Sequence, residues 1–89
     1  MCRNIRVLHH FQPPTTDEEI QAAALQYVRK VSGMTKAPAS PAANAVFEQA
    51  IAQIAAATKQ LLTTLPERGE PRTREREREK ARERWERRA

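Results

Sequence analysis

Three residues near the N-terminus, Cys2, His9 and His10, are the side chains best suited by type to metal binding. Zinc binds Cys sulfur and His nitrogen, but structural zinc sites use four ligands at recognisable spacings. Adjacent histidines also point in different directions. We therefore expect no bound metal or other cofactor, with one histidine packed and the other solvated.

Cys2 has a second chemical possibility, as an N-terminal nucleophile. Removal of Met1 would pair the thiol with an α-amine that can act as its base, and Arg3 and Arg6 would favour the thiolate. Enzymes of this kind hold the group in a large sandwich fold, which this chain is too short to form. We expect no catalytic residue and an idle or buried thiol.

The charges are unevenly distributed along the 89 residues. Residues 66–89 carry ten Arg/Lys and seven Glu, and Trp85 is their only large apolar side chain. The apolar core must come from residues 1–65, which predicts a small helical domain followed by a solvated Arg/Glu-rich tail. The sequence contains no run of ~20 apolar residues that could span a membrane and no signal-peptide pattern. With one cysteine, we expect a cytoplasmic protein.

A first helix is predicted over residues 17–32. Thr16 and Glu19 fit a capping box, and Gly33 is placed for a left-handed cap at the C-terminal end. Between them the apolar positions follow a helical stripe, formed by Ile20, Ala23, Ala24, Tyr27 and Val31 and widened by Leu25 and Val28.

A second helix is predicted over residues 41–65. Ser40 is a good N-cap and Pro41 suits the first helical position, whereas Pro66 cannot continue a helix. The apolar residues step by three and four, as in a coiled-coil seam: Phe47, Ile51, Ile54, Thr58, Leu61 and Leu65, widened by Val46, Ala50 and Leu62. At ~37 Å against ~24 Å, this helix is longer than the first. We expect its end to be covered by a protein partner, a second copy or the N-terminal segment at Leu61, Leu62 and Leu65.

The loop of residues 33–40 makes the two helices an antiparallel hairpin. In residues 1–12, Ile5, Val7 and Phe11 would share a strand face, whereas Ile5, Leu8 and Phe11 fit a helical turn. Because two helices cannot seal a core alone, we expect this segment to lie across the hairpin with its apolar residues in the core. The predicted fold class is all-α.

The tail is predicted to form a frayed, solvated helix over residues 72–88. Oppositely charged side chains recur at helical spacing, each pair contributing roughly 0.2–0.5 kcal/mol. The predicted pairs are Arg72–Glu75, Glu75–Arg78, Arg76–Glu79, Glu79–Arg82 and Glu83–Arg87.

The chain resembles a family of small proteins known only as a domain of unknown function. The most specific match is the opening Met-Cys-Arg-Asn-Ile, and the charged tail departs from the family pattern. The resemblance covers most of residues 1–65 and implies no catalytic residue. It is carried by residues 1–6, 11–20 and 22–33 and by Phe47, Ala50, Ile54, Ala55, Thr58, Leu61 and Leu62.

These patterns predict a non-catalytic helical interaction module whose partner the sequence does not identify. Nucleic-acid binding is the alternative, because cationic side chains can neutralise phosphates; the even interleaving of glutamate in the tail argues against it. Trp85 would serve as a stacking residue or as an anchor in a partner groove. A thiol or metal-dependent protein using Cys2 and His9 is the second alternative.

Overall fold

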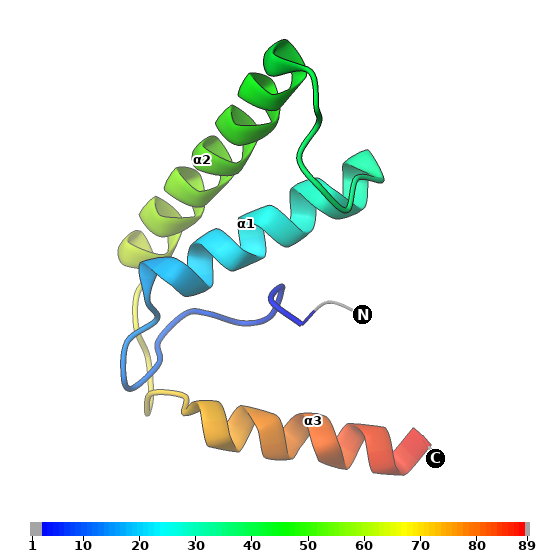
Figure 1. Ribbon diagram of the computed structural model, residues 1–89. Coiled ribbons are helices and arrows are strands. Elements are labelled where there is room, and N and C mark those ends of the chain that lie inside the picture. The colour runs from blue at the N-terminus through cyan, green and yellow to red at the C-terminus, as the bar shows by residue number, and fades with distance from the viewer. Residues whose placement is uncertain (1–2, 89) are drawn as a thin grey trace.

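Residues 3–88 are described by a computed structural model, and they form three helices and no strand. The helices are α1 (Asp17–Ser32), α2 (Pro41–Thr64) and α3 (Arg74–Arg88). Figure 1 shows α1 and α2 packed as an antiparallel pair, with α3 apart from them. The predicted all-α class, the hairpin and the helical tail are confirmed.

The ends of the first two helices follow the predicted capping residues. Thr16 Oγ1 accepts from the Glu19 amide at 3.2 Å, while Glu19 Oε1 accepts from the Thr16 amide at 2.9 Å. Gly33 has φ 71°, in the left-handed region that favours glycine. Ser40 caps α2, and Pro41 occupies its first turn. α2 ends at Thr64, one residue before the predicted end.

The core lies between α1 and α2 and contains seven buried residues. They are Leu8, Ile20, Ala24, Val28, Phe47, Ile51 and Ala55. The stripe predicted for α1 was too wide, because Tyr27 and Val31 are exposed. Figure 1 shows the reason for Val31: α1 and α2 converge where α1 begins and diverge towards the loop that joins them, so the last turn of α1 has no facing helix.

The N-terminal segment runs beside α1 without regular structure (Figure 1). Leu8 and Phe11 are buried, but Ile5 is 42% and Val7 50% exposed, so the expectation that all the apolar side chains enter the core was wrong. Gln26 Oε1 accepts from the amides of Asn4 at 2.7 Å and Ile5 at 3.2 Å. This clamp fixes the segment along α1, and the side chains at 5 and 7 point away from the core.

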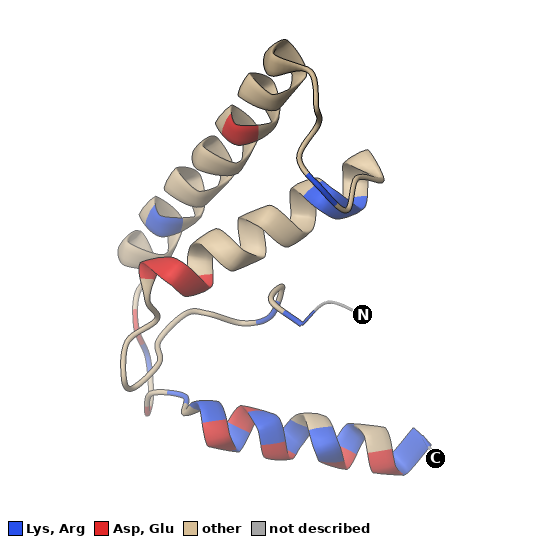
Figure 2. Ribbon diagram, viewed as in Figure 1, with Lys and Arg blue, Asp and Glu red and all other residues tan. Residues whose placement is uncertain are grey.

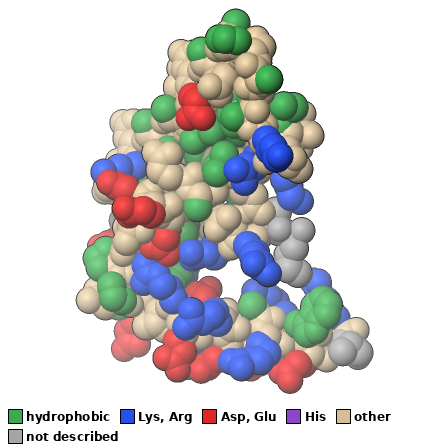
Figure 3. Space-filling view, viewed as in Figure 1, with side chains coloured by type: hydrophobic (Ala, Val, Ile, Leu, Met, Phe, Trp, Pro, Cys, Tyr) green, Lys and Arg blue, Asp and Glu red, His purple; other side chains and the backbone are tan. Residues whose placement is uncertain are grey.

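α3 is attached to the rest of the molecule near its first residue. The Gln12 amide donates to the Arg72 carbonyl at 2.9 Å, and the Arg72 amide donates to the His10 carbonyl at 2.8 Å. No residue of α3 is buried, and 13 of the 27 charged residues of the chain lie on it (Figure 2). Figure 3 shows an opening between α3 and the remainder, with Lys and Arg side chains around it.

Candidate interaction surfaces

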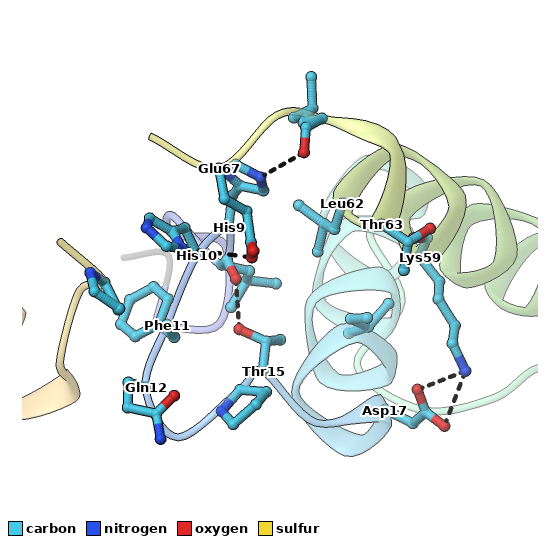
Figure 4. A pocket seen from close by; sticks show the side chains of 15 residues that line it. His9, His10, Phe11, Gln12, Thr15, Asp17, Lys59, Leu62, Thr63 and Glu67 are labelled. Carbon is cyan, nitrogen blue, oxygen red and sulfur yellow. Dashed lines mark hydrogen bonds and ion pairs between the residues drawn. The ribbon is translucent and has the colours of Figure 1, made fainter. Parts of the chain in front are cut away.

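The predicted histidine site lies in a groove of about 740 Å³ between the N-terminal segment and the end of α2 (Figure 4). His9 Nε2 is 3.3 Å from the Leu65 carbonyl, and His10 Nε2 is 2.9 Å from the Gly69 carbonyl. His10 Nδ1 lies 3.4 Å from a Glu67 carboxylate oxygen. Both imidazoles therefore bind backbone oxygens of the segment that leads to α3.

The described part of the chain contains no cluster of side chains that could support the metal-binding alternative. Within residues 3–88, no three His, Cys, Asp or Glu side chains are placed to hold one ion. The His9 and His10 rings are 6.1 Å apart and tilted by 44°. Cys2, the third ligand and the nucleophile of the thiol or metal alternative, lies outside the described residues.

The four residues of the predicted interaction surface do not form one patch. Leu62 is half-buried and packs against the core. Leu61 and Leu65 are 54% and 41% exposed at the end of α2. Trp85 is 64% exposed on α3, a helix that packs against neither α1 nor α2.

Leu61 and Leu65 belong to a longer uncharged surface that we call the α2 face. Helix geometry places its seven residues on one side of α2 at steps of three and four: Ala43, Val46, Ala50, Ile54, Ala57, Leu61 and Leu65. The charged residues of α2, Glu48 and Lys59, lie on another side, and Lys59 Nζ reaches Asp17 Oδ1 of α1 at 3.0 Å (Figure 4).

The predicted seam, with the residues that widen it, contains five of the seven residues of the α2 face and misses Ala43 and Ala57. Phe47 and Ile51 point into the core, and the α2 face is the adjacent ridge of the same helix. Val46, one of the residues that widen the seam, is 64% exposed next to the buried Phe47. The usable signal in the sequence was the spacing of alanines and aliphatic residues without a charge.

Glu19 is the most heavily contacted carboxylate among the described residues. Arg74 Nη2 lies 2.8 Å from Glu19 Oε1, and Arg74 Nε lies 3.1 Å from Oε2. Arg6 Nη2 donates to the same Oε2 at 3.0 Å. Hydrogen bonds from Arg74, with smaller contributions from Thr16 and Arg6, hold the pKa of Glu19 well below its ordinary value. In turn, the hydrogen bond to Glu19 raises the pKa of Arg74.

Arg74 makes further contacts that fix the start of α3. Its Nη1 donates to the Pro13 carbonyl at 2.7 Å and its Nη2 to the Pro14 carbonyl at 3.2 Å. The guanidinium carbon lies 5.3 Å from the centre of the Phe11 ring, within cation–π range. Arg74 therefore ties α3 to both the N-terminal segment and α1.

A second hollow, of about 350 Å³, lies between the N-terminal segment and α1. Arg3 and Asn4 line it from the segment, and Gln26, Arg29 and Lys30 line it from α1. No carboxylate lines this hollow among the described residues. It is therefore a concave, cationic site close to the backbone clamp made by Gln26.

These features define a small all-α protein, a two-helix hairpin with a charged helix tethered to it. The chain belongs to a family described as an uncharacterized conserved protein (DUF2277), whose model matches residues 1–80. The match continues past Arg74, so the start of the charged tail lies within the family region, contrary to the departure expected from the sequence. We found no match among curated proteins or solved structures. Of the helices described, none is long and apolar enough to cross a membrane.

Proposed function

We propose that the protein is a non-catalytic helical interaction module that pairs two copies of the chain through the α2 face. The observation that carries this proposal is the exposure of large apolar side chains on an uncharged ridge. Val46, Leu61 and Leu65 are exposed at both ends of the α2 face, and Ile54 is half-buried at its centre. A single cysteine suits a cytoplasmic location for this module.

The surface area of the chain supports an additional contact. A compact monomer of 10.2 kDa has about 5,300 Å² of accessible surface. The chain exposes 7147 Å², about 1,800 Å² more than that value. A standard protein interface buries about 800 Å² on each partner, and the rest of the excess includes the surface of α3, which packs against neither α1 nor α2. The molecule is also only 16 Å deep along its shortest axis, so its helices have no second layer over them.

The pattern of the α2 face favours a second copy as the partner. On each side of Ile54, the α2 face has first an alanine (Ala50 or Ala57) and then a larger aliphatic residue (Val46 or Leu61). An antiparallel pair with its two-fold axis near Ile54 would place Val46 against Leu61 of the second copy and Ala50 against Ala57. The alanines at 50 and 57 allow the two helices to approach closely. The same patch is used by both copies, as two-fold symmetry requires.

Sedimentation equilibrium at micromolar concentration tests this proposal on three chains. The wild type is expected to form a dimer, and Leu61→Glu, which would bury two charges in the interface, is expected to weaken dimerisation by at least about 10-fold. Ala52→Glu is the matched control, because Ala52 is an exposed residue of α2 on the side of Glu48 and Lys59. A wild type that is monomeric, or an equal loss in both variants, contradicts the proposal. Circular dichroism verifies that each variant is folded.

A further inference from the structure

The charges of α3 separate onto different sides of the helix although they alternate along the sequence. At ~100° per residue, four of the five glutamates of α3 share one side: Glu75, Glu79, Glu83 and Glu86. A different side, which we call the arginine face, carries Arg74, Arg78, Arg82 and Trp85. The interleaving that argued against a phosphate-binding arm therefore produces a helix with a face free of acids.

Arg74 determines where the arginine face points. Its side chain binds Glu19 and lies over Phe11, so this side of α3 faces the hairpin at the first turn. Residues four and eight positions later lie about 40° and 80° round the helix from Arg74, so Arg78 and Arg82 lie on the same half of α3 as Arg74. Figure 3 shows the opening beside α3. Arg78 and Arg82 are exposed, and neither forms an ion pair with another of the described residues. The pairs predicted with Glu75 and Glu79 are not formed.

The other side of the opening is also cationic. Arg6 and Arg74 meet at Glu19, and from this point the N-terminal segment and α3 extend towards the same side of the molecule (Figure 1). The segment ends at the hollow lined by Arg3, Arg29 and Lys30. These three side chains likewise have no ion pair within the described part of the chain. Their charges are available for a ligand.

We infer that this opening binds single-stranded nucleic acid, with phosphates on its cationic side chains and a base stacked on Trp85. Single-strand binders combine a cationic groove with aromatic stacking. Arg78 and Arg82 are ~6 Å apart along α3, close to two phosphate intervals of ~3.4 Å in a stacked strand. Trp85 follows them on the same face and is 64% exposed. The phosphate contacts are Arg3, Arg29, Lys30, Arg78 and Arg82.

Two other anionic ligands fit the opening less well. A membrane-surface helix needs an apolar face, and the uncharged residues of α3 are Ala81 and Trp85 alone. A duplex would keep its bases stacked internally and leave Trp85 without a base. This inference does not rest on pairing through the α2 face, which lies on a different helix.

The first test is titration of the full chain with a labelled oligothymidine of roughly 12 nucleotides, a length within known site sizes. Binding is expected to quench Trp85, the only tryptophan. With five phosphate contacts at ~0.7 each, log Kobs is expected to fall with log[salt] with a slope of about −3.5. Absence of binding at low salt, or binding without a change in Trp85 emission, overturns the inference.

Paired variants separate a site from general charge attraction. Arg78→Gln/Arg82→Gln and Arg76→Gln/Arg84→Gln each remove two charges from α3, but only the first pair lies on the arginine face. The first is expected to weaken binding about 10-fold and to reduce the salt slope by about 1.4. The second is expected to stay within about 2-fold. Equal losses from the two pairs overturn the inference.

Substitutions of Trp85 test base stacking, and competing ligands test the preference for a single strand. Trp85→Ala is expected to weaken binding about 10-fold, whereas Trp85→Phe retains most of the affinity because a ring remains for stacking. Equal weakening by both substitutions contradicts stacking. Tighter binding to a duplex of equal length, or to phosphatidylserine vesicles with the same dependence on Arg78 and Arg82, assigns the opening to that ligand and overturns the single-strand inference.

Discussion

The hairpin and α3 are both helical, but different forces hold them. α1 and α2 share a core of buried apolar side chains that includes Ala24, which is 2% exposed. α3 buries no side chain and is held at residues 72–74 by backbone hydrogen bonds and by Arg74. Apolar burial folds the hairpin, whereas polar contacts at one end position a helix that has no core of its own.

This difference implies different modes of opening. α1 and α2 share one core, so the hairpin should unfold as one cooperative unit. α3 extends fourteen residues beyond Arg74, so its far end can fray without any effect on the core. The variants below test whether the two regions respond separately.

The largest loss of stability is expected from a cavity in the core of the hairpin. Ile51→Ala removes a buried side chain between the helices and is expected to lower the free energy of unfolding by about 2–4 kcal/mol. Val31→Ala is the control, because Val31 is 66% exposed on α1; its effect should stay within about 0.5 kcal/mol. Urea denaturation followed by circular dichroism measures both. Similar losses would show that the core is not where the structure places it.

Two glycines provide a matched comparison between the regions. Gly33 and Gly69 have φ values of 71° and 74°, and an added Cβ would meet nothing within 4 Å at either. Alanine should cost about 1–2 kcal/mol at each, because both are left-handed. Gly33→Ala should appear in global unfolding, since Gly33 ends α1. Gly69→Ala should leave global unfolding unchanged and accelerate hydrogen exchange of the Arg72 amide. A global loss in both would place α3 in the cooperative unit.

The helices of the hairpin could be predicted because their signals are local. The capping box at Thr16, the glycine at 33 and the Ser40-Pro41 start each act within a few residues of the helix end. Burial was less predictable, because it depends on where the helices separate. Val31 lies in the periodic stripe of α1, yet it is exposed, since α2 has diverged from α1 at that level.

The attachment of α3 could not be predicted from the sequence. Glu19 was fully explained by its capping role, which left no reason to seek a partner 55 residues away. The tail pairs predicted from i, i+3 spacing also failed to form; the ion pair present within α3 is Glu77–Lys80, at 3.3 Å, among the residues described. Exposed pairs are weak enough that spacing alone does not select them. The arginine face likewise follows from the helix and from the direction set by Arg74.

Glu19→Gln is expected to release the start of α3 and to leave α1 intact. Glutamine at this position still completes the capping box, so the change acts on Arg74 and Arg6. The Arg72 amide should exchange roughly 5-fold faster, the scale of a partly exposed ion pair. Glu18→Gln is the control, because Glu18 is exposed in the same turn of α1. A lower helix content in α1 would contradict this separation of roles.

The ion pair between Glu19 and Arg74 should weaken as the pH falls. The folded pKa of Glu19 lies well below its ordinary value of 4.5, so the contact stabilises the structure fully above about pH 4.5. Its contribution is lost as the pH falls from there through the folded pKa. The Arg72 amide chemical shift should therefore be constant above about pH 5 and move as the pH is lowered below about 4.5 in the wild type, and less in Glu19→Gln. Equal movement in both would assign the transition to another carboxylate.

The smallest expected effect is the response of α3 to salt. α3 has no core, and the ion pair present within it among the described residues, Glu77–Lys80, contributes only about 0.2–0.5 kcal/mol. Screening at ~1 M salt, where the Debye length is ~3 Å, removes most of that attraction. The helicity of a 72–88 peptide should therefore fall modestly between ~0.01 M and ~1 M salt, whereas a fragment of residues 1–66 should hardly change because its core is apolar.

Trp85 reports the same difference in the full chain. Its emission should remain solvent-like at every salt concentration, since its side chain is 64% exposed. A blue-shifted, salt-insensitive Trp85 would mean that α3 docks on the hairpin and that one core holds both regions.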